Sequence, residues 1–480
     1  MQPLKEIWNN EIVNGKTFPD QLKLADITPI HKKLETFLPK NYRPVSVLPV
    51  VSKIFERLMQ NQMNTFITKY LSPYLCGYRK GYNPQYALIA MFENWKKALD
   101  KPGGIFTAVL MDLSTAFDTI NHELLIAKLE AYGFNEDALE LLSNYLKNRW
   151  QRTKINITFS SWKELLCGVP QGSVLGPLLF NIYLNDIFFF IKDSHICNFA
   201  DDTTLSTFGT NIDIIHDLEC DTLTAISWFE SNYMILNADK CHFMSSGMIE
   251  HLWLRVGDEQ IWESREQKLL GITLDKDLTF KSHLNKLCRK VGQKISALSR
   301  ISKLLPFHKR NLILKTFIES QFSYCPLVWM FTGRKINRKI NYLHERALRL
   351  VYCDYDSTFK ELLTMDKSIT FHQRNIHYVA IEMFKIKNGL SPSFIADMFQ
   401  LTSGNTRTGG DRFMRPNVNT VKKGENSIRY FDPIVWNIML PNDLKVCTSL
   451  DEFKIKLKKW VPSNCPCKIC KLYVQGLGFI

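Results

Sequence analysis

The sequence predicts an α+β protein in which a mixed N-terminal part is followed by a mainly helical C-terminal part. The chain has 480 residues, more than one compact core usually holds, so two or three domains are expected. Short β-prone runs alternate with amphipathic segments as far as Asp275, and basic helical segments dominate from His283 onward. This change in composition places the main expected boundary at 275–285.

The composition is that of an ordinary globular protein, but the charge is unusual. Apolar residues make up 45% of the chain and charged residues 22%, whereas the net charge is +14. Such an excess predicts a polyanionic partner, with nucleic acid ahead of a membrane surface. The chain opens without the apolar core of a signal peptide, so we expect reduced cysteines and a location in nucleus and cytoplasm.

The first elements are two strands and a helix. The alternating segment 22–33 is β-prone, and Pro44 forces Arg43 into an extended conformation on a second strand. Apolar residues at helical spacing predict an amphipathic helix over 50–70.

The middle of the chain carries strands that end in acidic residues. A strand over 106–113 ends at Asp112, and a hairpin over 196–205 has Asp201 and Asp202 at or near its turn. The most apolar stretch, 175–191, is interrupted by polar residues and predicts a buried helix, so no membrane association is expected. The other expected elements are helices at 124–132, 137–146 and 222–232, a sharp turn at 168–173 and a strand at 268–275.

The C-terminal third is expected to be helical. Basic helices are predicted at 284–304, 309–322 and 336–352, and an exposed loop at 402–415.

Three carboxylates are the candidate catalytic and metal-binding groups. Asp201 and Asp202 are adjacent and follow an apolar run, where burial makes their mutual repulsion costly unless a cation lies between them. Together with Asp112 they place three acids at two strand ends, enough to hold two Mg²⁺ ions, with Mn²⁺ as the alternative. A lone strand-end aspartate is more often a turn former and an acidic pair is often a solvated turn, but the surrounding apolar residues favour the metal site.

Further residues are candidates for binding a nucleotide. Phe117 lies five positions after Asp112, where a ring can clash with a sugar 2′-hydroxyl, although a single Phe is more often a core residue. Gln171 and Gly172 lie in a turn whose glycine would let substrate approach the backbone closely. The alternative is a turn with no role in binding.

Three cations could meet phosphate groups. Arg43 and Lys32 are candidate clamps on a triphosphate, and Lys240 is a candidate proton donor to departing pyrophosphate. The alternative for each is a solvated surface charge, which is the more common fate of a lysine.

The order of these motifs resembles the reverse transcriptases of non-LTR retrotransposons, of the LINE-like type that includes the jockey group. Phe199-Ala200-Asp201-Asp202 is similar to the family's motif C. The other matching segments, in family order, are 23–29 and 41–46 (fingers motifs), 112–118 (motif A), 168–177 (motif B), 236–240 (motif D) and 269–271 (motif E).

The resemblance implies a right-hand polymerase fold with fingers and palm at 1–275, a helical thumb at 276–335 and a helical region at 336–480. It implies an RNA-directed DNA polymerase that binds an RNA template, a DNA primer and dNTPs. By the same match Asp112, Asp201 and Asp202 bind metal and Phe117 is the steric gate. Gln171 lies beside template and nucleotide, Arg43 meets the triphosphate, and Lys240 is the motif D lysine.

The chain also departs from the family pattern. Autonomous members carry an endonuclease domain before the polymerase, and we expect this chain to lack it, as a truncated element copy or an incomplete gene product would. The alternative function is a catalytically silent nucleic-acid-binding remnant of a retrotransposon. The intact acids argue against that alternative, since binding alone does not require them.

The C-terminal tail contains three close cysteines, Cys465, Cys467 and Cys470. A closed structural zinc site needs four ligands, no histidine lies nearby in the sequence, and Cys447 is a distant fourth. We therefore expect ordinary reduced cysteines rather than zinc.

Overall fold

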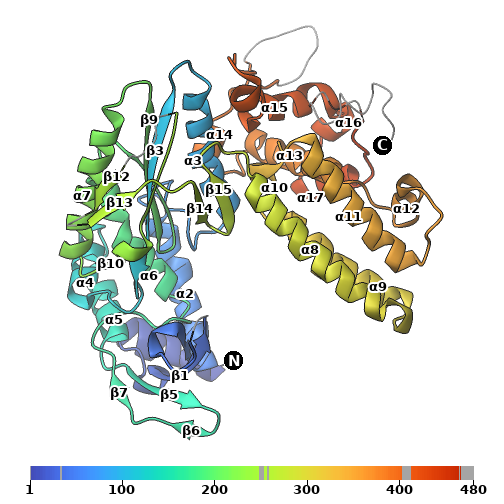
Figure 1. Cartoon of the computed structure of the whole chain (residues 1–480). Coiled ribbons are helices and arrows are strands. Elements are labelled where there is room, and N and C mark those ends of the chain that lie inside the picture. Colours follow the sequence, from blue (N-terminus) through green and yellow to red (C-terminus); the bar gives the residue numbers. More distant parts are fainter. Residues whose placement is uncertain are drawn as a thin grey trace.

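A computed structural model of the chain describes residues 2–32, 35–247, 253–256, 259–402, 412–463, 465 and 467. The described residues form an arch of two lobes (Figure 1), one with the sheets and the N-terminus and one that is helical. The predicted α+β fold with a helical C-terminal region is confirmed.

The sheet that carries the acids has four antiparallel strands. Its order is β11 (His242–Ser246), β3 (Ile105–Met111), β9 (Asp202–Gly209) and β8 (His195–Phe199). Every residue of β3 is buried, and its side chains alternate between two cores on opposite faces. Helix α3 (Pro84–Leu99) covers one face and α7 (Ile214–Ser231) the other (Figure 1). We call this four-stranded sheet the palm sheet.

A second sheet lies at the far end of the N-terminal lobe. In it β1 (Leu24–His31) pairs antiparallel with β2 (Tyr42–Val47) and parallel with β5 (Trp150–Ile155). The predicted strand carrying Arg43 is therefore confirmed. The remaining strands are β4 (Leu113–Ser114), β6 (Thr158–Phe159), β7 (Lys163–Glu164), β10 (Ile235–Leu236), β12 (Trp253–Val256), β13 (Glu259–Trp262), β14 (Glu266–Leu269) and β15 (Ile272–Asp275). The remaining helices of this lobe are α1 (Gln2–Glu6), α2 (Val50–Ile67), α4 (His122–Ala131), α5 (Glu136–Leu146) and α6 (Gly176–Leu184).

Two long basic helices dominate the C-terminal lobe. In α8 (Lys281–Ile301), Leu284, Cys288 and Val291 are buried at helical spacing and pack toward α11 (Arg334–Tyr352). The other α-helices are α9 (Phe307–Ile313), α10 (Pro326–Trp329), α12 (Phe359–Met365), α13 (Phe371–Lys387), α14 (Ser393–Ala396), α15 (Ile428–Ile434), α16 (Asn442–Lys445) and α17 (Leu450–Leu457).

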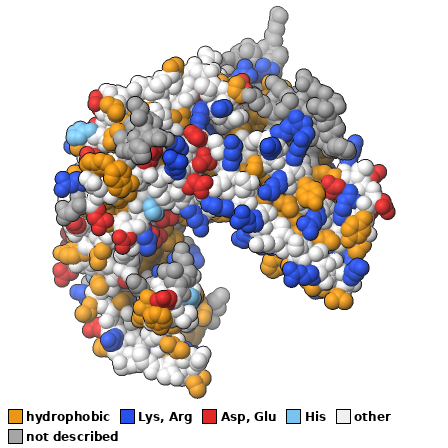
Figure 2. Space-filling view, in the orientation of Figure 1, with side chains coloured by type: hydrophobic (Ala, Val, Ile, Leu, Met, Phe, Trp, Pro, Cys, Tyr) orange, Lys and Arg blue, Asp and Glu red, His pale blue; other side chains and the backbone are white. Residues whose placement is uncertain are grey.

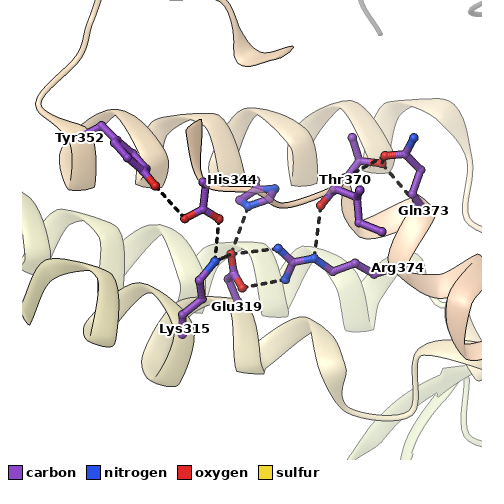
Figure 3. A network of polar contacts seen from close by, with 9 residues as sticks. Lys315, Glu319, His344, Tyr352, Thr370, Gln373 and Arg374 are labelled. Carbon is purple, nitrogen blue, oxygen red and sulfur yellow. Dashed lines mark hydrogen bonds and ion pairs between the residues drawn. The ribbon is translucent and has the colours of Figure 1, made fainter. Parts of the chain in front are cut away.

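A buried polar network joins the helices of this lobe (Figure 3). Glu319 accepts two hydrogen bonds from the Arg374 guanidinium, at 2.7 and 3.0 Å, and lies 3.3 Å from His344 Nε2. Burial raises the pKa of Glu319, but hydrogen bonds from His344 and Arg374 outweigh it and hold the pKa below its usual range. Lys315 bridges Glu319 and Asp366, so the network links the chain before α10 to α11, α12 and α13.

The two lobes share one apolar core through α3. The Tyr86 hydroxyl donates to Glu382 at 2.6 Å, and Arg429 donates to Asn94 at 2.7 Å. Asp100 accepts hydrogen bonds from the backbone of residues 419 and 420. The core therefore continues across the predicted boundary at 275–285, and the division into 1–275, 276–335 and 336–480 stays a prediction.

Four predicted elements differ from the structure. The predicted strand 268–275 is a hairpin of β14 and β15, because Leu270 and Gly271 take φ values of +45° and +82°. The predicted helix 175–191 leaves α-helical geometry after Leu184. The helix predicted from Thr222 begins eight residues earlier, at Ile214. The predicted helix 309–322 is α9 followed by a π-helical turn (Leu314–Ile318) and a 3-10 turn (Glu319–Ser323).

No helix in the described ranges is long and apolar enough to cross a bilayer. Residues 403–411 of the predicted loop 402–415 lie outside the described residues.

Candidate active site

Asp112 follows the last residue of β3 at the open end of the palm sheet. Its carbonyl oxygen accepts from Asn237 N at 2.9 Å, and its carboxylate Oδ2 lies 2.7 Å from Lys240 Nζ. The structure thus brings the predicted motif A acid and the predicted motif D lysine into direct contact.

Asp201 and Asp202 lie at the turn of the β8–β9 hairpin, as predicted. Phe199 pairs with Asp202, and Ala200 takes a φ of +58°, which a two-residue hairpin turn requires at its first central position. Asp201 is exposed at the tip and Asp202 is half-buried at the start of β9. Met111 pairs with Thr203, so Asp112 and Asp202 occupy the next positions on adjacent strands.

The hairpin turn rests on the segment 74–77. Cys76 N donates to Asn198 O at 2.8 Å, and Asn198 N donates to Tyr74 O at 3.0 Å. A β-carbon on Gly77 would lie 2.2 Å from Ala200 N, so only glycine lets the two backbones approach this closely. These backbone contacts fix the β8–β9 turn in place, and with it the positions of Asp201 and Asp202.

The three acids influence one another. Burial raises the pKa of Asp202 to about 6, and the negative charges of Asp201 and Asp112 add to the shift. Their oxygens are not drawn into one tight cluster: among the described residues, only a different group brings three potential ligand atoms within 4.8 Å of one another. An all-oxygen donor set fits Mg²⁺, which binds through one or two carboxylates and completes its coordination shell with waters and substrate phosphates.

Phe117 is held in an aromatic stack beside the acids. Its ring lies parallel to Phe180 of α6, with centroids 4.8 Å apart, and meets the edge-on ring of Tyr78 at 5.8 Å. Tyr78 is half exposed, and burial followed by the charge of Asp201 raises its pKa. Tyr78 is a neighbour of Phe117 that the sequence did not predict, although it lies directly after Gly77.

The turn with Gln171 and Gly172 is locked to strand β2. Gln171 O accepts from Ser46 N at 2.8 Å, and a β-carbon on Gly172, whose φ is +132°, would lie 2.5 Å from Ser46 O. The Gln171 amide donates to both oxygens of Asp118, at 2.9 and 3.0 Å. Burial raises the pKa of Asp118, while Gln171 and then Lys32 lower it.

The two remaining predicted cations belong to the second sheet: Arg43 lies in β2, and Lys32 follows the last residue of β1. Arg43 and Lys32 are both exposed. Arg43 lies near enough to Tyr78 for its positive charge to oppose the rise in the pKa of Tyr78. In the same way, the charge of Lys32 opposes the rise in the pKa of Asp118. A cavity of about 530 Å³ lies nearby, lined among others by Ser46, Asp118 and Gln171. The structure therefore places Arg43 near Tyr78 and Lys32 near Asp118, and their contact with a nucleotide stays a prediction.

Tyr324 is a second residue near the acids that the sequence did not predict. Its hydroxyl donates to Leu270 O at 2.6 Å, and its ring packs against Gly271 in the predicted motif E. Burial raises the pKa of Tyr324 to about 12, and Asp202 contributes. Nothing in the local sequence marks a tyrosine 54 positions downstream as part of this turn.

Comparisons with known proteins identify the family. A profile described as "Reverse transcriptase (RNA-dependent DNA polymerase)" matches residues 30–274. The chain is 27% identical over 373 residues to the probable RNA-directed DNA polymerase from transposon BS of Drosophila melanogaster, covering 72% of this chain and 40% of the relative. It is 27% identical over 370 residues to the polymerase from mobile element jockey of the same species, covering 71% and 39%. The chain thus spans about two fifths of the length of these relatives.

Among solved structures, apo telomerase from Candida Tropicalis aligns with a TM-score of 0.40 at 12% identity, covering 82% of this chain and 67% of that one. Telomerase from Candida albicans in complex with a fragment of telomeric RNA aligns with a TM-score of 0.37 at 13% identity, covering 76% and 65%. The profile match covers just over half of the sequence, and the chain therefore belongs to the reverse transcriptase (RNA-dependent DNA polymerase) family.

Proposed function

We propose that this chain is an RNA-directed DNA polymerase that extends a primer 3′-hydroxyl with dNTPs. One observation carries the proposal: Asp112, Asp201 and Asp202 lie together at the ends of adjacent palm strands, within the segment that matches the family. Few other groups at this site could act as general bases, which suits a reaction driven by positioning and charge neutralisation.

The three acids are the proposed holders of two Mg²⁺ ions, with Mn²⁺ as the alternative. Asp112 and Asp201 are the main ligands, and the more buried Asp202 contributes negative charge or a further oxygen. When bound, the ions would lower the pKa of the primer hydroxyl and neutralise the leaving pyrophosphate. Lys240 balances the charge of Asp112 and, once released from that carboxylate, becomes the proposed proton donor to the pyrophosphate.

The nucleotide is proposed to lie between the acids and the second sheet. Phe117, fixed between Phe180 and Tyr78, is the proposed barrier to a 2′-hydroxyl. Arg43 and Lys32 are proposed to bind the triphosphate. The Gln171–Gly172 turn, which is held against Ser46 of β2, is proposed to lie beside the template base and the nucleotide.

The RNA template and DNA primer are proposed to lie in the hollow between the lobes. Figure 2 shows Lys and Arg side chains along the edge of the helical lobe that faces this hollow. Helix α8 contains no acidic residue, and Lys286, Arg289 and Lys290 are exposed on its surface. Contacts of this kind recognise the backbone of a hybrid duplex rather than its bases.

The test is primer extension on an RNA template with Mg²⁺. Asp112→Asn and Asp201→Asn should each lower dNTP incorporation at least about 100-fold, because each removes a direct metal ligand. Glu230→Gln, a change in an exposed acid of α7, is the matched control and should keep full activity. Incorporation that is equal in wild type and Asp201→Asn would contradict the proposal. Salt-dependent RNA binding without incorporation by the wild type would favour the silent remnant instead.

A further inference from the structure

We propose that His372, Cys465 and Cys467 form a structural zinc site that fastens the C-terminal tail to helix α13. These are the residues whose potential ligand atoms lie within 4.8 Å of one another, and no such group of three occurs elsewhere in the described ranges. None of the three residues belongs to the proposed active site, so this inference stands apart from the proposed function.

The distances fit a tetrahedral metal. His372 Nε2 lies 3.3 Å from Cys467 Sγ and 3.7 Å from Cys465 Sγ. With Zn–S near 2.3 Å and Zn–N near 2.0–2.1 Å, a tetrahedral angle separates sulfur and nitrogen by about 3.5 Å. The two observed separations bracket that value, and the two sulfurs lie within 4.8 Å of each other, so the three atoms are close enough to share one ion.

The chemistry of the donor set selects zinc. Two thiolates and one imidazole are borderline-soft ligands, which magnesium and calcium avoid and zinc prefers. His372 and Cys465 are 9% and 7% exposed, so an ion there would be shielded from water. His372 Nδ1 is buried and has no hydrogen-bond partner within the described part of the chain, so Nε2, which faces both sulfurs, is the ring nitrogen that would bind the ion.

The backbone brings the tail to this place through contacts that need no metal. Gln373 Nε2 donates to Pro462 O at 3.2 Å, and His377 Nε2 lies 2.9 Å from Trp460 O. The His377 and Trp460 rings also stack, with centroids 5.6 Å apart. These contacts lie along one side of α13. They place Cys465 and Cys467 beside His372, which lies in the first turn of that helix.

The expectation of ordinary reduced cysteines rested on the lack of a nearby histidine in the sequence. The fold supplies His372 from 93 residues upstream of Cys465. Cys447 is not the missing ligand, since its thiol faces Asp443 O at 3.7 Å and lies outside the group. Cys470 follows Cys467 at a spacing common among zinc ligands, but it lies outside the described residues.

The site would stabilise the start of α13. Phe371, the residue before His372, packs on Phe322 with ring centroids 4.4 Å apart. Arg374, two residues after it, holds Glu319 in the network of Figure 3. A metal bound at His372 therefore fixes the helix turn on which the polar network of the helical lobe depends.

The experiment measures metal in the purified full-length chain. Wild type should keep one zinc per chain through gel filtration, and Co²⁺ exchanged into the site should show thiolate-to-cobalt charge transfer and tetrahedral d–d bands. His372→Gln and Cys467→Ser should each lower zinc content at least about tenfold. Cys447→Ser changes a buried thiol outside the group and should leave zinc content unchanged.

A second measurement uses only the wild type, so it remains informative if the variants fail to fold. In the wild type, bound zinc should protect Cys465 and Cys467 from alkylation, and a chelator should expose them, while the exposed Cys353 reacts in both states. Wild type that retains no zinc and gives no thiolate–cobalt band would overturn the proposal. Unchanged zinc content in His372→Gln would overturn it as well, because the tail would then bind metal without the helix.

Discussion

The contact between Asp112 and Lys240 shows how three acids coexist in the chain. The Lys240 side chain is 60% exposed and that of Asp112 30%, so solvent screens the ion pair and keeps it weak. A weak pair can be exchanged for a divalent ion at little cost. Lys240 therefore acts as a replaceable counter-charge at the same carboxylate that the proposed metal uses.

Phe117 provides a prediction about substrate choice. Phe117→Ala should reduce discrimination against ribonucleotides roughly tenfold or more, because the ring fixed by Phe180 no longer blocks a 2′-hydroxyl. The measurement is the ratio of kcat/KM for dNTP and rNTP on one template. Tyr78→Phe keeps the neighbouring ring and is the control. An unchanged ratio in Phe117→Ala would exclude the gate.

His195 provides a prediction about pH. Both ring nitrogens are buried without a hydrogen-bond partner in the part of the chain that the structure describes, and burial lowers the pKa of His195 to about 4. The folded chain therefore rejects a proton that the unfolded chain accepts below pH 6.5. His195 therefore leaves the free energy of unfolding unchanged above pH 6.5 and lowers it as the pH drops toward 4. The loss is about 2 kcal/mol at pH 5.

The His195→Phe variant tests this sign. Phenylalanine preserves the edge-on contact with the Tyr74 ring, whose centroid lies 4.3 Å away, but cannot take up a proton. The drop in thermal unfolding midpoint between pH 7.5 and pH 5 should be smaller in the variant than in wild type. His308→Phe, at an exposed position of α9, should leave the drop unchanged. Equal drops in all three proteins would refute the assignment.

At the scale of elements, the close packing of Gly77 on the β8–β9 hairpin makes a prediction. Gly77→Ala places a β-carbon against backbone atoms of Ala200, which cannot move as a side chain could. The change should cost roughly 1–3 kcal/mol and displace Asp201, with at least a tenfold loss of primer extension. Gly333→Ala, where no atom lies within 4 Å of the new carbon, is the control. Wild-type extension rates in Gly77→Ala would show that the turn does not depend on this contact.

The elements that the sequence predicted well share a local signal. The Asp201–Asp202 hairpin follows from an apolar run that ends in two acids, and α2 follows from its apolar spacing. Helix α3 was not predicted, because it is buried on nearly all sides and so lacks amphipathic periodicity. The break at Gly271 was missed although glycine was its signal, and the pairing of His372 with the tail depends on long-range folding that no local pattern records.

At the scale of the whole molecule, the charge of the helical lobe predicts the salt dependence of nucleic-acid binding. Arg289→Gln and Lys290→Gln should each make the slope of log K against log salt shallower by about one, because each removes one phosphate contact. Lys101→Gln, at an exposed turn after α3, is the control and should leave the slope unchanged. The measurement is hybrid-duplex binding at several salt concentrations. Slopes equal to wild type in the α8 variants would place the duplex elsewhere.

The shared core around α3 has a consequence for how the protein is made. This helix leaves the ribosome well before its partners Glu382 and Arg429, which are synthesised some 300 residues later. The palm sheet covers one side of α3, but the side that packs on the helical lobe stays uncovered until the chain as far as α15 has emerged. A nascent chain stalled before these helices would therefore expose an apolar, aggregation-prone surface on α3.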